Sequence, residues 1–327
     1  MKILYAASNS YGARLQLSRW LQAMQGSGHQ IKIAAYKKSS PKRVNIDWTL
    51  NALLNIYQPD LLSTNNDNLS IYYEQVKDYA PDLVISDLEY FTSYVANSLN
   101  SIIWQCSSSL ISHAITRRER YNLGLFKYHA HSLNRDPAHT QRTINLIDNS
   151  NANFVYSHYG DADNPPLLQK DYEWIRPYHQ IGKTHLTCAH SIVAGLSTND
   201  KQILTLLKRY SQDSVVFLEG RSEKYQNIAV KDIENADEYY CNLKNSERFI
   251  CQGQASFLAD AFYNGKFSLI YPDYEDTESL INSQLTNKLG LGFIISPSED
   301  FRYLSTHQAY PQYQSTIKYL HQKIKDL

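Results

Sequence analysis

The stretch FICQGQASFLADAFYNGKFSLIYPDYEDTESLINSQLTNKLGLGFII, Phe249–Ile295, decides the fold. It alternates apolar runs, at Phe249–Cys251 and Phe267–Tyr271, with two segments of helical spacing that end at Gly265 and Gly290. Short apolar runs are typical of buried strands, and a glycine directly after a helix is the usual C′ residue. The stretch therefore predicts strand, turn, helix, strand, loop, helix and strand, the unit of a doubly wound α/β domain, with capping roles for both glycines.

Two loops of this unit fall where such domains bind ligands, outside the carboxyl ends of the strands. One is the turn Gln252-Gly253-Gln254, which leads through Ala255 and Ser256 into a helix whose N-terminal N–H groups suit a phosphate. The other carries Glu278, whose carboxylate can accept two hydrogen bonds from a ribose diol. Together they predict a nucleotide site. The alternative for Glu278 is a solvated first-turn glutamate that favours the helix dipole.

The order and spacing of these residues resemble the donor-binding half of GT-B glycosyltransferases. The matching positions are Gly253, Asp260-Ala261, Gly265-Lys266, Glu278-x-x-x-Asn282 and Leu289-Gly290-Leu291-Gly292. The positions that depart from the family pattern are Gln254 for a second glycine, Asp260 for the commoner glutamate and Ser279 for the commoner glutamine. The resemblance implies that a nucleotide-diphosphate sugar binds here as a substrate, and that the protein has no cofactor.

The N-terminal residues predict a βαβ unit. Ile3–Ala7 and Ile31–Tyr36 form strands on either side of a helix. The loop after the first strand holds Tyr11, Gly12 and Arg14, which we expect to contact the acceptor or the donor phosphate; the alternative for Arg14 is a surface residue at a helix start. Many GT-B enzymes carry a catalytic histidine in this loop. This sequence has none there, so the general base must come from elsewhere.

Asp87 and Glu89 directly follow an apolar strand predicted at Asp82–Ser86. The run resembles the Asp-Phe-Glu-Pro run of MJ-type, family 28-like glycosyltransferases, with Leu88 and Tyr90 in place of the phenylalanine and proline. We expect these two carboxylates to have different roles, one facing the site and the other structural. Either can be the general base that inverting sugar transfer needs, and the alternative is a pair of helix-start residues.

Further basic and hydroxyl residues are candidates for phosphate or acceptor contacts. Ser197 and Arg221 follow predicted strands of the second half and either bind the donor diphosphate or act as an N-cap and a surface residue. Lys42 and Arg43 lie in a basic run that is either a solvated loop or a contact for a phosphate-bearing acceptor such as duplex DNA.

The amino-acid composition limits which partners, compartment and metal sites we expect. The 327 residues contain 32 Lys+Arg and 32 Asp+Glu, so no net charge draws the protein to nucleic acid or an anionic membrane. The four cysteines are scattered without metal-binding spacing and predict reduced thiols in a cytoplasmic protein. No apolar run has the length of a membrane span, and no Asp-x-Asp metal motif occurs, so helix N-termini and arginines are expected to meet the leaving-group charge.

The resulting hypothesis is an α/β protein of two Rossmann-like domains that face each other across a cleft. Residues 1–178 bind the acceptor, residues 179–305 bind the donor, and a helix over 306–327 packs back on the first domain. The resemblance implies an inverting, metal-independent glycosyltransferase whose acceptor is a glycan, a lipid, a small molecule or a hydroxymethylated base in phage DNA. The alternatives are a non-catalytic nucleotide-sugar-binding protein and a nucleotide-sugar epimerase of the same fold.

Overall fold

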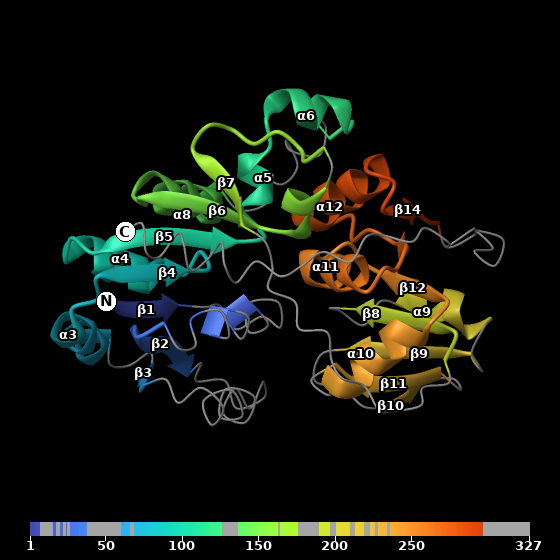
Figure 1. Cartoon of the computed structure of the whole chain (residues 1–327), viewed down its shortest axis with the longest axis horizontal. Coiled ribbons are helices and arrows are strands. Elements are labelled where there is room, and N and C mark those ends of the chain that lie inside the picture. The colour runs from blue at the N-terminus through green and yellow to red at the C-terminus, as the bar shows by residue number, and fades with distance from the viewer. Residues whose placement is uncertain are drawn as a thin grey trace.

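A computed structural model gives the fold (Figure 1). It describes residues 1–6, 16–17, 20–21, 24, 27–37, 60–65, 69–125, 137–162, 164–175, 190–196, 201–209, 213–218, 223–225, 228–233 and 236–296. The boundary expected at 178 and the helix expected over 306–327 lie outside these residues, so both stay predictions.

The first of two sheets is entirely parallel. Its seven strands run in the order β3-β2-β1-β4-β5-β6-β7. Their bounds are β1 Lys2–Ala6, β2 Gln30–Lys37, β3 Asp60–Asn65, β4 Leu83–Ser86, β5 Ile102–Ser107, β6 Ala152–Tyr156 and β7 Tyr172–Ile175.

The second sheet also has seven strands, in the order β10-β11-β9-β8-β12-β13-β14. Only its edge strand β10 is antiparallel to its neighbour. The bounds are β8 Ile192–Leu196, β9 Ser214–Leu218, β10 Glu223–Tyr225, β11 Ile228–Asp232, β12 Arg248–Cys251, β13 Ser268–Ile270 and β14 Gly292–Ile294.

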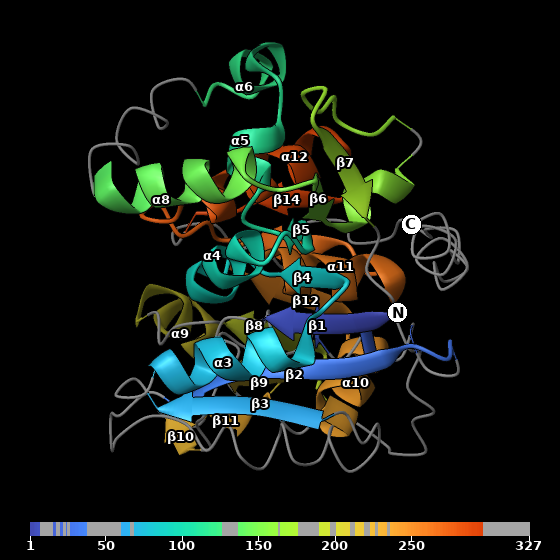
Figure 2. The ribbon, with the colours of Figure 1, turned by 90° about the vertical axis from the view of Figure 1, so that its left-hand side faces the viewer.

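Helices cover the sheets and join them. Figure 2 shows α3, α4 and α8 on the side of the first sheet that faces the viewer. The helices are α3 Leu69–Tyr79, α4 Tyr90–Ser98, α5 Ile111–Ala114, α6 Arg117–Asn122, α8 Pro137–Asp148, the 3₁₀ helix η2 His158–Asp161, α9 Lys201–Lys208, α10 Ala236–Asn245, α11 Ala255–Tyr263 and α12 Thr277–Lys288.

Both faces of the first sheet are buried. Along β1, Ile3 and Tyr5 enter one core while Leu4 and Ala6 enter the other, the period of two that a strand imposes. The second core contains Val76 of α3 with residues of α4. Burial on both faces explains why these strands read as continuous apolar runs rather than as alternating ones.

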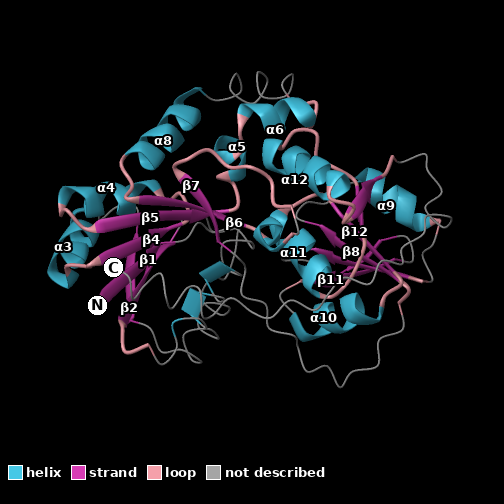
Figure 3. Cartoon of the chain, turned by 45° about the horizontal axis from the view of Figure 1, so that its top comes forward, coloured by secondary structure: helices cyan, strands magenta, loops and turns pink. Residues whose placement is uncertain are grey.

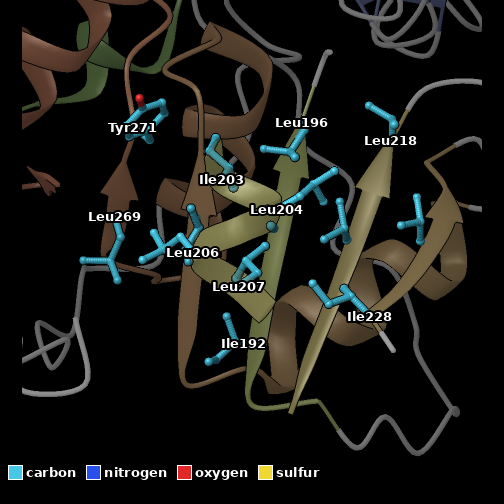
Figure 4. Packing of buried hydrophobic residues seen from close by; sticks show 14 of the residues in the cluster. Ile192, Leu196, Ile203, Leu204, Leu206, Leu207, Leu218, Ile228, Leu269 and Tyr271 are labelled. Atoms are coloured by element: carbon cyan, nitrogen blue, oxygen red, sulfur yellow. The ribbon is translucent and has the colours of Figure 1, made fainter. Parts of the chain in front are cut away.

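The second sheet is built in the same way. Helix α9 turns Ile203 and Leu207 toward Leu196 of β8 and Ile228 of β11 (Figure 4). A separate cluster on the other face includes Phe249 of β12 together with residues of α10 and α11. The apolar stripe of α9 lets this short helix cover one face of a parallel sheet.

The two sheets share one topology. One edge strand of each sheet, β7 in the first and β10 in the second, is left out of the comparison. When the other six strands are numbered in chain order within their own half, each sheet has the order 3-2-1-4-5-6. This order reverses direction between its first and fourth strands, and ligands of doubly wound folds bind at that reversal, beyond the carboxyl ends. The reversal lies between β1 and β4 in the first sheet and between β8 and β12 in the second. Asp87 directly follows β4, and the Gly253 turn directly follows β12.

The two lobes meet through α11 and α12, which lie between the sheets in Figure 1 and Figure 3. One apolar cluster joins Leu280, Ile281 and Leu285 of α12 to residues of α5 and η2. Polar contacts across the same surface join Tyr263 to Asp161, 2.7 Å apart, and Lys288 to Glu119, 2.6 Å apart. We call this surface, formed by α5, α6 and η2 against α11 and α12, the interlobe seam.

Most elements expected from the sequence are confirmed, including two Rossmann-like domains. Gly265 and Gly290 follow the ends of α11 and α12 with φ of +65° and +69°, as expected for C′ glycines. The structure also has an edge strand, β7, paired with β6, which the sequence analysis did not predict. Its four residues include the exposed Glu173, so the apolar signal was too short to detect.

The cysteine expectation needs one correction. Cys106 and Cys251 are free and buried, but Cys241 in α10 takes part in a disulfide whose partner lies outside the described residues. The prediction of four reduced thiols is therefore wrong for Cys241. It rested on scattered spacing, which cannot show whether two cysteines meet in the fold. The cysteine count thus gives no support for a reducing compartment.

Candidate functional site

Asp87 lies at the carboxyl end of β4, next to the end of β1. Its backbone N–H donates to the Ala6 carbonyl at 2.8 Å, which extends the parallel pairing of the two strands by one residue. The following residue, Leu88, has φ +52°, a conformation that costs energy for a non-glycine residue and turns the chain sharply out of the strand. Burial and the nearby charge of Asp87 together raise the pKa of the Cys106 thiol beneath it.

Glu89 has a different role from Asp87. It is the N-cap of α4, and its two carboxylate oxygens accept hydrogen bonds from the N–H groups of Phe91 and Thr92, at 2.8 and 2.6 Å. Both oxygens are therefore engaged by the helix start, as in an ordinary capping residue. Of the two carboxylates expected near the site, this arrangement leaves Asp87 as the candidate for chemistry.

A buried polar network supports the turn between β4 and α4. The Ser86 hydroxyl accepts from the Glu89 N–H at 2.9 Å and contacts the Ser93 hydroxyl at 3.0 Å. Ser93 in turn donates to the Glu89 carbonyl at 2.7 Å, and Gln105 of β5 donates to Ser93 at 3.2 Å. These bonds hold the strained Leu88 turn, and with it Asp87, in one place.

The turn of Gly253 is packed tightly against α12. Gly253 has φ +87°, and a Cβ at this position would lie 2.5 Å from the Ser283 hydroxyl and 2.7 Å from the Ser279 carbonyl. The Ser279 hydroxyl donates to the Gln252 carbonyl and accepts from the Asp273 N–H. Only glycine fits here, and the reason is contact with α12 as well as backbone conformation.

The start of α11 lacks a capping side chain. Gln254 is the N-cap residue and makes no side-chain cap hydrogen bond, and the buried Ala255 and half-buried Ser256 follow it. By contrast, Asp276 caps α12 by accepting from the Glu278 N–H at 3.0 Å. The first-turn N–H groups of α11 thus have no side-chain acceptor at the cap, which suits an anionic ligand.

Glu278 lies in the first turn of α12 and is held from the other lobe. The hydroxyl of Ser109, in the loop after β5, donates to Glu278 Oε2 at 2.5 Å. Burial raises the pKa of Glu278 to about 7, with further contributions from the charges of Asp276 and Asp87. The charge of Asp87, in the other lobe, is thus close enough to Glu278 to affect its pKa.

Asn282 follows Glu278 by one turn of α12 and is buried. Its backbone carbonyl accepts from the Tyr159 hydroxyl at 2.8 Å, and that hydroxyl also lies 2.8 Å from Thr286 Oγ1. The Asn282 side chain has no hydrogen-bond partner among the described residues. A buried amide without a partner costs free energy, so a bound water or ligand group is expected to complete it.

The structure thus brings several predicted site residues to one edge, where the carboxyl ends of both sheets meet. They are Asp87, Gly253, Gln254, Ala255, Ser256 and Glu278. Apart from Glu89, which caps α4, the remaining candidates lie outside the described residues and are Tyr11, Gly12, Arg14, Lys42, Arg43, Ser197 and Arg221. Ser109 also lies at this edge, where it contacts Glu278; it ends the polar run Gln105–Ser109, and a polar run directly after a strand is the sequence signal for a residue that lines the cleft.

The described residues contain no group of three or more His, Cys, Asp or Glu side chains arranged to hold a metal ion. Their helices include none with the length and apolar character that crossing a membrane requires.

Comparison with known proteins places this fold. No protein-family model and no curated protein sequence matches the chain. Solved structures of GT-B glycosyltransferases do match, over most of this chain and most of their own length.

Three of these structures illustrate the likeness. The spinosyn forosaminyltransferase SpnP is 16% identical, with a TM-score of 0.57 over 91% of this chain and 86% of its own. The calicheamicin glycosyltransferase CalG4 is 12% identical, with a TM-score of 0.59 over 90% and 85%. The spinosyn rhamnosyltransferase SpnG, complexed with thymidine diphosphate, is 12% identical, with a TM-score of 0.56 over 91% and 87%. At these identities the likeness establishes the GT-B fold.

Proposed function

We propose that this protein is a glycosyltransferase that moves a sugar from a nucleotide-diphosphate sugar to a hydroxyl group of an acceptor. The observation that carries the proposal is the hydrogen bond from Ser109 to Glu278 across the lobes, which sets Glu278 against the carboxyl edge of the first sheet, the edge at which Asp87 follows β4. One lobe can thus hold the donor while the other presents a base to the acceptor.

In this proposal the second lobe binds the donor. The uncapped start of α11, after the Gly253 turn, takes the diphosphate through its N–H groups and the positive end of the helix dipole. Glu278 accepts hydrogen bonds from the ribose diol. The further candidates for diphosphate contacts are Ser197 and Arg221. Ser197 directly follows β8 in the sequence, and β8 pairs with β12. The thymidine diphosphate bound to SpnG supports a nucleoside diphosphate as the ligand class.

Asp87 is the proposed general base. It takes the proton of the acceptor hydroxyl as that oxygen forms a bond to the anomeric carbon of the donor. The bond from the anomeric carbon to the diphosphate breaks, and the nucleoside diphosphate leaves with the electron pair. Attack from the face opposite the leaving group inverts the anomeric configuration. Glu89 is not the base in this scheme, because both of its oxygens cap α4.

We further propose that the reaction needs no metal ion, because the dipole of α11 and its first-turn N–H groups meet the charge of the leaving diphosphate. Transfer measured with excess EDTA should equal transfer measured with added Mg²⁺. A loss of activity with EDTA that Mg²⁺ restores would contradict this part of the proposal.

The acceptor class is a proposal with two branches. A glycan, lipid or small molecule fits a chain without net charge, while a hydroxymethylated base in DNA requires the basic run with Lys42 and Arg43 to contact phosphates. A gel shift with duplex DNA at rising salt separates them. Salt-dependent retardation that the Lys42→Ala, Arg43→Ala double variant loses favours DNA, and no retardation favours the first branch.

The direct test is a donor screen by thermal shift, followed by an assay for released nucleoside diphosphate. We expect one nucleotide sugar to raise the melting temperature and to be consumed. Asp87→Asn should keep donor binding and lose at least 100-fold in turnover, on the order of what general-base catalysis contributes, while Glu89→Gln retains turnover. Binding without release would instead favour a non-catalytic sugar-nucleotide-binding protein, and conversion of the sugar without acceptor would favour an epimerase.

A further inference from the structure

The carboxylate assigned to the ribose accepts a hydrogen bond from the protein itself. Ser109 Oγ donates to Glu278 Oε2 at 2.5 Å. The two partners are 169 positions apart in the sequence and belong to different lobes. One oxygen of the carboxylate that would accept a ribose diol is therefore engaged by a hydroxyl group of the other lobe.

A ribose diol and Ser109 use the same acceptor. An ionised carboxylate has two oxygens, and two vicinal hydroxyls that bind side by side place one donor on each of them. Ser109 already donates to Oε2 at 2.5 Å. The diol hydroxyl that binds Oε2 therefore either shares this oxygen with Ser109 or displaces it.

Ser109 can release Glu278 without separating the lobes. Helix α12 is fixed at the interlobe seam, because Leu280 and Leu285 are buried there and the buried Tyr159 hydroxyl is bonded to Asn282 and Thr286. Ser109 itself is exposed, so a rotation about χ1 moves its hydroxyl to solvent. The serine, rather than the helix, is the element that gives way.

The contact also has a reason to exist without ligand. Glu278 lies near two other carboxylates, Asp276 and Asp87, and is partly removed from water. Hydroxyl donors stabilise its ionised form and fix the orientation of the carboxylate at the start of α12.

We propose that Ser109 is a residue of the first lobe that sets donor affinity by occupying Glu278 until the ribose of a nucleoside diphosphate displaces it. This inference rests on the proposed function, since it assigns Glu278 to the ribose. It predicts that removal of the Ser109 hydroxyl strengthens binding, whereas removal of an ordinary contact residue would weaken it.

The test is isothermal titration with uridine diphosphate and thymidine diphosphate at neutral pH. Ser109→Ala should bind the preferred nucleotide about three- to tenfold more tightly than the unaltered protein, the range expected for release from one competing hydrogen bond. Ser98→Ala is the matched control, because Ser98 is also an exposed serine of the first lobe and its hydroxyl donates to the Val95 carbonyl of its own helix rather than to the other lobe. It should leave the affinity unchanged.

A double-variant cycle shows whether Ser109 acts through Glu278. Glu278→Gln should weaken binding, and adding Ser109→Ala to it should have no further effect. Unchanged or weaker binding by Ser109→Ala, with Glu278→Gln still weakened, would overturn the inference and leave the proposed function standing. Equal binding by the unaltered protein and Glu278→Gln, or no binding by any variant, would overturn both.

Discussion

Tyr159 is the residue that joins the lobes most directly. Its side chain is fully buried, and its hydroxyl contacts the Asn282 carbonyl and Thr286 Oγ1, both at 2.8 Å. The ring also packs edge-to-face against Trp174. The hydroxyl thus makes a buried polar contact within the interlobe seam.

Tyr159→Phe keeps the ring and removes only the hydroxyl. Two groups of α12 then lose a partner in a buried place, which should lower the free energy of unfolding by about 1–3 kcal/mol. Denaturant unfolding measures this, with Tyr121→Phe as control because Tyr121 is 73% exposed. Equal stability of the two variants would show that the seam does not depend on this hydroxyl.

His158, next to Tyr159, is buried without a hydrogen bond from either ring nitrogen among the described residues. Its ring packs against Tyr159 and against Phe262 of α11, with centroids 4.2 and 5.1 Å apart. Burial lowers its pKa from 6.5 to about 3. The ring is therefore neutral in the folded protein throughout the range in which an exposed histidine gains a proton.

This shift predicts a loss of stability in acid. Between the folded pKa of about 3 and the unfolded value of 6.5 the unfolded chain binds more protons, so His158 favours folding above pH 6.5 and that contribution is lost as pH falls. From about pH 7.5 to about pH 4.5 the loss should be about 2–3 kcal/mol. His158→Phe, which gives up no hydrogen bond, should flatten this dependence in unfolding curves measured at both pH values. Parallel curves for the two proteins would contradict it.

At the scale of elements, the contact between the β12–α11 turn and α12 fixes the candidate donor site. Gly253 approaches Ser279 and Ser283 too closely for a side chain, whereas Gly265, at the end of α11, has a positive φ but open space around its Cα. Substitutions at these two glycines therefore distinguish the free-energy cost of a positive φ from the cost of contact with α12.

Gly265→Ala should cost about 1 kcal/mol, from its positive φ alone. Gly253→Ala should cost about 3 kcal/mol or more, because its methyl group also meets the Ser279 carbonyl. The difference in the free energy of unfolding between the variants, measured under the same conditions, reports the contact with α12. A difference near zero would mean that the turn can move away from α12 without cost.

How far the sequence could predict this site depends on the kind of signal. Asp87, Gly253 and Glu278 each follow an apolar strand, so the position of the site at the carboxyl ends was accessible from pattern alone. The division of roles between Asp87 and Glu89 was not, because a glutamate at a helix start is equally compatible with a base and with a cap. The reason why only glycine fits at position 253 could not be predicted either, since the close approach of Gly253 to Ser279 and Ser283 depends on how α12 packs.

At the scale of the whole molecule, the seam should make the two lobes unfold together. All four tryptophans, Trp20, Trp48, Trp104 and Trp174, lie before residue 178, so their fluorescence reports the first lobe, whereas far-ultraviolet circular dichroism reports both. We expect the two denaturation curves to coincide, because α12 belongs to the core shared by both lobes. A fluorescence transition separate from that of the dichroism would show that the lobes are independent.

The same architecture places the proposed chemistry between the lobes. The parallel strands of both sheets direct their loops to a common edge, and the Ser109 contact with Glu278 shows that side chains from the two sides meet there. A nucleoside diphosphate bound at this edge would contact the Gly253 turn and Glu278 and face Asp87.

A crystal structure of the protein with the nucleoside diphosphate of its preferred donor is the most direct test of this account. We predict density for the diphosphate at the N-terminus of α11 and for the ribose against Glu278, with the Asp87 carboxylate facing the diphosphate. Ligand bound elsewhere, with Glu278 still held by Ser109, would contradict the account.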